Sequence, residues 1–128
     1  MVIQVYLERI KDRLLTDPVV QNFHIVRQRE ALFDGFIRVR VTLQDDSFLE
    51  FSEYVQRTAN DDIVIIKYSY HWANAQGDLI KRWDNAAHFP DLPGFPHHVH
   101  DGVVEQVLPA RPVDIFVILD VIAQTIAA

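Results

Sequence analysis

The sequence contains no cysteine, which excludes a disulfide framework, a cysteine-ligated zinc site and a thiol nucleophile. It has only four glycines, and it has no phosphate-cradling glycine loop, nucleophile elbow or dinucleotide fingerprint. A large nucleotide cofactor is therefore not expected. The longest apolar run, at 115–128, is interrupted by Asp120 and Gln124 and is too short to span a bilayer, and the N-terminus lacks the apolar stretch of a secretory signal. We therefore expect a cytoplasmic protein with no membrane partner.

The composition is that of a globular protein. Hydrophobic residues make up 49% and charged residues 23% of the 128 residues, which predicts a single domain, 1–128, with a core of its own. The net charge is −6, and this argues against a broad, nonspecific coating of nucleic acid. It does not exclude one local basic face, so the distribution of the arginines matters more than the sum of the charges.

Hydrophobic periodicity predicts a helix near each end of the chain. Residues 2–15 repeat apolar side chains at helical spacing, and Pro18 disfavours continuation of that helix. Residues 115–127 show a second amphipathic pattern, preceded by Asp114, which is a good N-cap residue.

Between these helices the period changes to two, which predicts antiparallel strands from about 20 to 83 and a last strand at 103–108. The segment 84–102 contains three prolines and two glycines and is predicted to be irregular. The turns are expected at Asp34-Gly35, 45–47, 60–62 and 73–78. This order predicts an α+β fold: a twisted antiparallel meander of five or six strands, with the N-terminal and C-terminal helices packed on one face.

A two-residue turn at Asp34-Gly35 would gather arginines on one face of the sheet and place His24 on the core side. The arginines on that face are Arg27, Arg29, Arg38 and Arg40, with Glu50 of the next strand nearby. Closely spaced arginines repel one another unless acids or an anion compensate them. The pattern is compatible with phosphate contacts, an interface for a protein partner, or a solvated face.

Five of the six histidines fall between residues 71 and 100. They are His71, His88, His97, His98 and His100, and Arg82, Asp84 and Asn85 lie among them. Imidazole transfers protons near neutral pH and is the commonest metal ligand.

Three interpretations of this histidine cluster stay open. The first is a metal site, in which His98 and His100 on one side of an extended segment combine with His71 or an aspartate. The second is metal-independent acid–base cleavage of a phosphodiester, and the third is a structural role in which the imidazoles tie the loop to the sheet.

Three segments of this region also carry a family resemblance: YSYHW at 68–72, GDLIKRWDNA at 77–86 and LPGFPHHVHDG at 92–102. They resemble the TumE family, small toxins of bacterial and archaeal type II toxin–antitoxin pairs. The rest of the chain fits that family in outline. In the family pattern the Asp-Asn-Ala step at 84–86 is followed by a proline and a pair of histidines, where this sequence has Ala87, His88 and Phe89.

The resemblance implies a growth-inhibiting toxin that a cognate antitoxin neutralises by direct contact. By analogy with other small toxins that have histidine and arginine centres, we expect a ribonuclease acting on RNA. Metal-independent chemistry is favoured and no cofactor is required, although a divalent metal is compatible with the residues.

We expect proton transfer from His71, His98 and His100, stabilisation of phosphate charge by Arg82, and orientation of a histidine by Asp84. A second tier consists of Asn85, His88 and His97. If a metal is bound, its expected ligands are His71, His98 and His100. The alternative is a non-enzymatic protein-binding module whose histidine-rich loop is structural or binds a metal. The apolar C-terminal helix and an exposed sheet edge would suit a homodimer.

Overall fold

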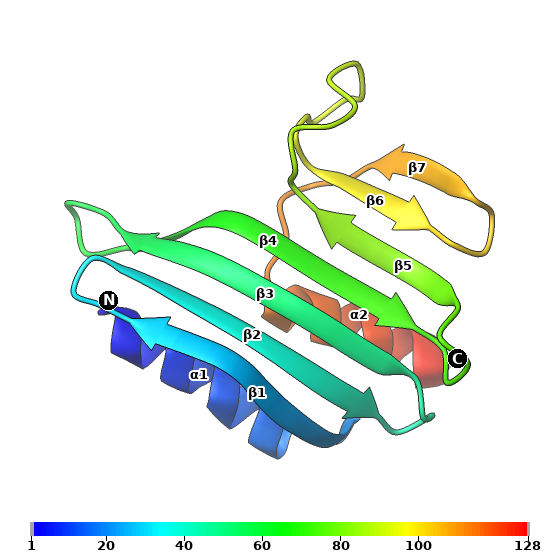
Figure 1. Cartoon of the computed structure of the whole chain (residues 1–128), viewed down its shortest axis with the longest axis horizontal. Coiled ribbons are helices and arrows are strands. Elements are labelled where there is room, and N and C mark those ends of the chain that lie inside the picture. The colour runs from blue at the N-terminus through cyan, green and yellow to red at the C-terminus, as the bar shows by residue number, and fades with distance from the viewer. Residues whose placement is uncertain (1, 128) are drawn as a thin grey trace.

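A seven-stranded antiparallel sheet and two helices make up the computed structural model, which describes residues 2–127 (Figure 1). The strands neighbour one another in chain order: β1 (Val20–Glu30), β2 (Asp34–Leu43), β3 (Phe48–Arg57), β4 (Ile63–Ala73), β5 (Leu79–Asp84), β6 (His98–Asp101) and β7 (Gln106–Pro109). The helices are α1 (Ile3–Thr16) and α2 (Ile115–Ala127). The α+β class and the antiparallel meander are confirmed, whereas the prediction of five or six strands is wrong. The predicted domain 1–128 includes residues 1 and 128, which lie outside the described residues.

The additional strand is β6, inside the segment predicted to be irregular. Prolines 90, 93 and 96 prevent regular structure in the part of this segment that ends at Pro96. The four residues of β6 follow it and contain no proline. They pair with β5, so that His98 lies opposite Asp84 and His100 lies opposite Arg82. The last strand was predicted at 103–108. In the structure it begins three residues later, at 106, because residues 102–105 form the turn into β7.

The core lies between the two helices and the face of the sheet that they cover, and Figure 1 shows both helices behind the sheet. Helix α1 contributes Ile3, Leu7, Ile10 and Leu14, and α2 contributes Ile115, Ile118, Leu119 and Ile122. Helix α2 begins where expected, because the carboxylate of Asp114 accepts a hydrogen bond from the Val117 backbone N–H at 2.9 Å. Within residues 2–127, neither helix has the length and apolar character needed to cross a membrane.

Gly35 lies inside β2 rather than in a turn, so the prediction of a turn at Asp34-Gly35 is wrong. Residues 31–33 connect the strands, and Gly35 pairs with Glu30 of β1. A Cβ atom on Gly35 would lie 2.5 Å from Cγ2 of Ile3, so the missing side chain lets α1 approach the sheet. The neighbouring Asp34 accepts two hydrogen bonds from the guanidinium of Arg29, at 2.9 and 3.1 Å. Packing and ion pairing explain this Asp-Gly step.

We expect the substitution Gly35→Ala to lower the free energy of unfolding by about 1–3 kcal/mol, because the added methyl group overpacks the contact with Ile3. Chemical denaturation measures the change. A double-mutant cycle with Ile3→Ala, which removes the opposing methyl group, provides the control. The loss of unfolding free energy in the double variant should be smaller than the sum of the losses in the two single variants. Strict additivity would contradict the close approach of α1.

His24 lies on the open face opposite Arg40, which corrects its predicted place on the core side. Irregularities in β1 between Val20 and Asn22 and between Ile25 and Arg27 shift the alternation. The side chains of Phe23 and Ile25 therefore pack against the core, and His24 is exposed.

One carboxylate, Glu53 of β3, is fully buried on the helix side of the sheet. It accepts hydrogen bonds from the hydroxyl groups of Tyr6 at 2.5 Å and Tyr70 at 2.6 Å, and from the backbone N–H of Ile115 at 3.0 Å. Burial raises the pKa of Glu53, while these hydrogen bonds act in the opposite direction. The side chain thus joins α1, the sheet and the first turn of α2.

Candidate active site

The face of the sheet opposite the helices carries a row of polar side chains that crosses four strands. Glu50 of β3 lies opposite His71 of β4, His71 lies opposite Arg82 of β5, and Arg82 lies opposite His100 of β6. Neighbouring strands are about 4.8 Å apart, so the backbones at His71 and His100 are about 10 Å apart with Arg82 between them. Strand pairing therefore places two imidazoles on either side of one guanidinium.

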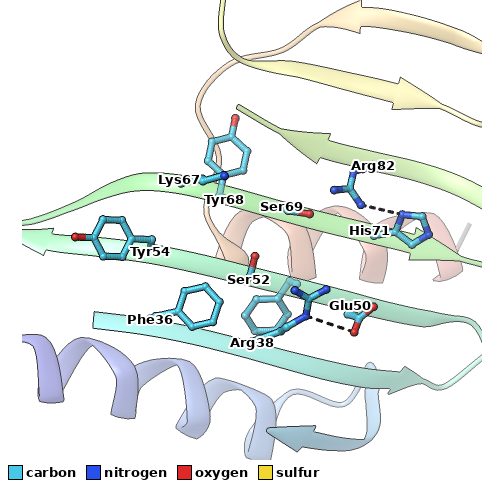
Figure 2. A pocket seen from close by; sticks show the side chains of 11 residues that line it. Phe36, Arg38, Glu50, Ser52, Tyr54, Lys67, Tyr68, Ser69, His71 and Arg82 are labelled. Carbon is cyan, nitrogen blue, oxygen red and sulfur yellow. Dashed lines mark hydrogen bonds and ion pairs between the residues drawn. The ribbon is translucent and has the colours of Figure 1, made fainter. Parts of the chain in front are cut away.

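The imidazole of His71 contacts this guanidinium directly (Figure 2), with Nη1 of Arg82 3.3 Å from Nδ1 of His71. A guanidinium only donates hydrogen bonds, so Nδ1 is the acceptor and the ring is neutral in this arrangement. Burial lowers the pKa of His71, the charge of Arg82 adds to this effect, and the carboxylate of Glu50 opposes it. The lone pair of Nδ1 is therefore the site at which His71 can accept a proton once Arg82 releases it.

Behind the row lies a polar cluster centred on the carboxylate of Asp84. Its Oδ2 accepts a hydrogen bond from Nε of Arg82 at 3.2 Å, and its Oδ1 accepts one from the backbone N–H of Ala86 at 3.1 Å. The same Oδ1 lies 2.9 Å from Nε2 of His98, whose side chain is 1% exposed. Asp84 thus holds the Arg82 side chain on the sheet and next to the histidines.

His100 sits at the edge of this cluster. Its Nε2 lies 4.0 Å from Oδ2 of Asp84, its ring centroid lies 4.9 Å from that of His98, and its side chain is 30% exposed. Burial lowers the pKa of His100, and the neighbouring His98 and Arg82 add to this effect, whereas Asp84 opposes it. Unlike His98, His100 can meet a ligand that approaches the open face.

The loop at 85–97 covers His98 through Phe89. The ring of Phe89 packs edge-on against His98 at a centroid distance of 5.2 Å and against His100 at 5.8 Å. His88 is exposed on the same loop, with its ring 6.1 Å from that of Phe89. The chain thus places an apolar ring over the two imidazoles of β6, and His98 is sealed from solvent.

Two residues of the predicted second tier make contacts elsewhere. His97 is on the helix side, where its Nδ1 lies 2.8 Å from the hydroxyl oxygen of Tyr68 and its ring stacks on the tyrosine. The Asn85 side chain extends the pairing of β5 with β4: it accepts from the N–H of Tyr68 at 3.0 Å and donates to the carbonyl of Ile66 at 3.0 Å. The structure brings neither side chain to the His71–Arg82–His100 row.

Among residues 2–127, one group of three side chains has ligand atoms close enough to hold a metal ion. It consists of Asp84, His98 and His100, whose ligand atoms all lie within 4.8 Å of one another. The set predicted from the sequence contained His71 in place of Asp84. His71 lies on the other side of Arg82 from His100. The sequence analysis had considered His71 or an aspartate as the third ligand, and in the structure the third residue is Asp84.

A groove of about 470 Å³ leads along the open face to His71 and Arg82 (Figure 2). Its cations are Arg38, Lys67 and Arg82, and among the described residues that line it one is acidic, Glu50, which lies 3.6 Å from Arg38. The aromatic side chains that line it from this face are Phe36 and Tyr54, whereas the rings of the other two lining aromatics, Phe51 and Tyr68, pack in the core on the helix side. The groove is therefore locally cationic and aromatic in a chain whose net charge is −6.

The four predicted arginines share the open face but have different partners. Arg38 lines the groove, Arg27 lies 5.7 Å from the ring centroid of Phe36, Arg40 lies 4.7 Å from that of Phe48, and Arg29 pairs with Asp34. The sequence analysis missed Lys67 as a groove residue. It could have been found by following the alternation from His71 along β4.

The comparison with known families adds to this geometry. A family model described as Toxin TumE matches residues 8–128. The chain belongs to the TumE toxin family. No match was found among the curated proteins or among the solved structures. Membership of the TumE family confirms the resemblance of 68–102, extends it over nearly the whole chain, and supports a toxin role with an antitoxin as partner.

Proposed function

We propose that this chain is the toxin of a type II toxin–antitoxin pair and that it cleaves RNA in the cytoplasm at the His71–Arg82–His100 row. Membership of a toxin family supports the first part and suggests a cognate antitoxin that neutralises it. The single observation that carries the second part is the cross-strand row, in which two imidazoles flank one guanidinium on an accessible face.

The chemistry follows from the groups in the row. As Arg82 turns from Nδ1 of His71 to the phosphate, this lone-pair nitrogen removes the proton from a ribose 2′-hydroxyl, whose oxygen attacks the adjacent phosphorus. Arg82 stabilises the negative charge that develops on the phosphoryl oxygens. His100, in its protonated form, gives its proton to the departing 5′ oxygen. The products are a 2′,3′-cyclic phosphate and a 5′-hydroxyl, and no metal or other co-reactant is needed.

Asp84 and His98 are positioning residues in this scheme. Asp84 holds Nε of Arg82 at 3.2 Å, which directs the rest of the guanidinium toward His71. His98 is sealed beneath Phe89 and supports Asp84 from the buried side. This assigns to His98 a role different from the proton transfer expected from the sequence.

The groove supports single-stranded RNA as the substrate. Arg38 and Lys67 can contact backbone phosphates, and the rings of Phe36 and Tyr54 offer faces for unstacked bases. Base-paired RNA presents neither free base faces nor a splayed backbone to such a surface. We therefore expect cleavage of single strands and loops, with duplexes cut much more slowly.

Incubation of the purified chain with a labelled single-stranded RNA in the presence of EDTA tests this function. We expect cleavage by the wild type, no detectable cleavage by His71→Gln, and wild-type cleavage by His24→Gln, which changes an exposed histidine near the edge of the same face. Equal loss in both variants, or an intact RNA with the wild type, would contradict the proposal.

The pH dependence of cleavage provides a second test. His71 must be neutral to accept a proton, and burial and the charge of Arg82 lower its pKa from the usual 6.5, with Glu50 opposing. The acid limb of kcat/KM should therefore lie below pH 6.5. In Arg82→Met, which removes one cause of the lowering, this limb should shift upward in the residual activity. A limb at or above 6.5 in the wild type would contradict the assignment of the base.

A further inference from the structure

We propose that Asp84, His98 and His100 bind a divalent transition-metal ion of the zinc class, and that an ion held there silences the ribonuclease. The binding of the ion is independent of the proposed function. The silencing rests on the proposed function, because it depends on the proton that His100 delivers. No step of the cleavage scheme uses this ion.

The sheet itself builds the site. Asp84 of β5 pairs with His98 of β6, and His98 and His100 alternate along β6 so that both side chains lie on the open face. Their ligand atoms lie within 4.8 Å of one another, and a tetrahedral ion with bonds of about 2.1 Å would draw them to about 3.4 Å, a shift that small side-chain rotations can supply. Two imidazoles and one carboxylate suit Zn²⁺ and its first-row neighbours better than Mg²⁺, which prefers oxygen ligands.

The buried Nε2 atom of His98 gives an independent reason to place a cation here. Nδ1 of His98 lies 2.9 Å from the carbonyl oxygen of Pro96, and because that oxygen only accepts, Nδ1 carries the hydrogen. In the neutral ring Nε2 is then a lone pair facing Oδ1 of Asp84 at 2.9 Å. The nitrogen is buried and has no hydrogen-bond partner with acceptable geometry. Two buried acceptor atoms that face each other without a hydrogen between them are unfavourable, and a positive charge between or beside them removes this cost.

A proton on His98 would satisfy only that one contact, whereas a metal ion would satisfy Asp84, His98 and His100 together. The guanidinium of Arg82 opposes the ion, because it is a fixed positive charge that already occupies Oδ2 of Asp84 at 3.2 Å. With three protein ligands and this neighbouring cation, binding should be weaker than at a four-ligand structural zinc site. Such affinity suits a site that is filled and emptied as the metal concentration changes.

The silencing follows from the position of His100. An imidazole whose Nε2 is bound to a metal ion cannot carry a proton on that atom, so the proposed proton donor is lost while the ion is present. His71 and Arg82 would remain in place, and RNA would still bind in the groove. We therefore expect Zn²⁺ to lower the rate of cleavage and to leave RNA affinity nearly unchanged.

Calorimetric titration of Zn²⁺ into chelator-treated, dialysed protein tests the binding. We expect one saturable site per chain in the wild type, and a loss of affinity of at least about 100-fold in His100→Gln and in Asp84→Asn, because each removes a ligand. His100 is partly exposed, so its variant should fold even if a change at the buried His98 does not. His24→Gln, which changes an exposed histidine outside the cluster, should bind as the wild type. No saturable binding, or equal binding by all variants, would overturn the site.

RNA cleavage measured with and without Zn²⁺ separates this inference from the proposed function. We expect the metal to inhibit the wild type and EDTA to restore the rate. Unchanged cleavage at saturating Zn²⁺ would overturn the silencing. A protein that binds Zn²⁺ but never cleaves RNA would overturn the proposed function and the silencing, and it would leave the binding site standing. Cleavage that requires Zn²⁺ would overturn both the silencing and the metal-independent scheme.

Discussion

Replacing Arg82 with methionine should lower the rate of RNA cleavage by about 100- to 1,000-fold, because the row loses the cation that contacts both the proposed base and Asp84. Methionine keeps the length and much of the apolar stem of the side chain. The loss should appear mainly in kcat, since stabilisation of the developing phosphoryl charge is made in the transition state. Single-turnover cleavage of a labelled RNA measures the effect.

The matched control is Arg111→Met, which removes an exposed arginine from the segment before α2. Its cleavage rate should stay within about twofold of the wild type, because surface charges far from the chemistry contribute little. Far-ultraviolet circular dichroism establishes that both variants are folded. A folded Arg82→Met protein that cleaves RNA at the wild-type rate would remove Arg82 from the centre.

The second large effect concerns stability and lies on the other face of the sheet. Replacing Glu53 with alanine should lower the free energy of unfolding by about 3–5 kcal/mol, because two buried tyrosine hydroxyls and the backbone N–H of Ile115 lose their common acceptor. Urea denaturation followed by tryptophan fluorescence measures the loss. The control Glu30→Ala removes an exposed acid of β1 and should change stability by less than about 0.5 kcal/mol.

The dependence of this stability on pH has a defined sign. Burial raises the pKa of Glu53 above its usual 4.5, so its contribution to stability is fully present below pH 4.5 and is lost as the pH rises through the folded-state pKa. The difference in unfolding free energy between the wild type and Glu53→Gln should therefore shrink as the pH rises from 4.5. A difference that grows over this range would show that the pKa of Glu53 is lowered in the folded protein.

Much of the fold was predictable, because local chemistry determines it. The helical spacing of Ile3, Leu7, Ile10 and Leu14 needs no long-range information, and the same is true of the Asp114 N-cap. The meander follows from turn residues between alternating strands. The Asp-Gly step failed as a turn signal because its glycine serves packing with Ile3, a residue more than thirty positions away in the sequence.

The candidate site was predictable in composition and less so in arrangement. The concentration of histidines pointed to the residues of the row, but only the register of β4, β5 and β6 puts Arg82 between His71 and His100. Likewise, the His97-His98 pair gave no sign that its two rings lie on opposite faces of the sheet. That outcome depends on where β6 begins, after a proline-containing loop whose course local patterns do not determine.

The ends of the cleaved RNA test the central claim most directly. After digestion of a defined single-stranded RNA in EDTA, mass spectrometry of the fragments should find 2′,3′-cyclic phosphate and 5′-hydroxyl termini, because the proposed chemistry uses the 2′-oxygen as nucleophile. A substrate with 2′-deoxyribose at the cleaved position should stay intact. Fragments with 3′-hydroxyl and 5′-phosphate ends, or cutting of the deoxy substrate, would show that His71, Arg82 and His100 do not act in this way.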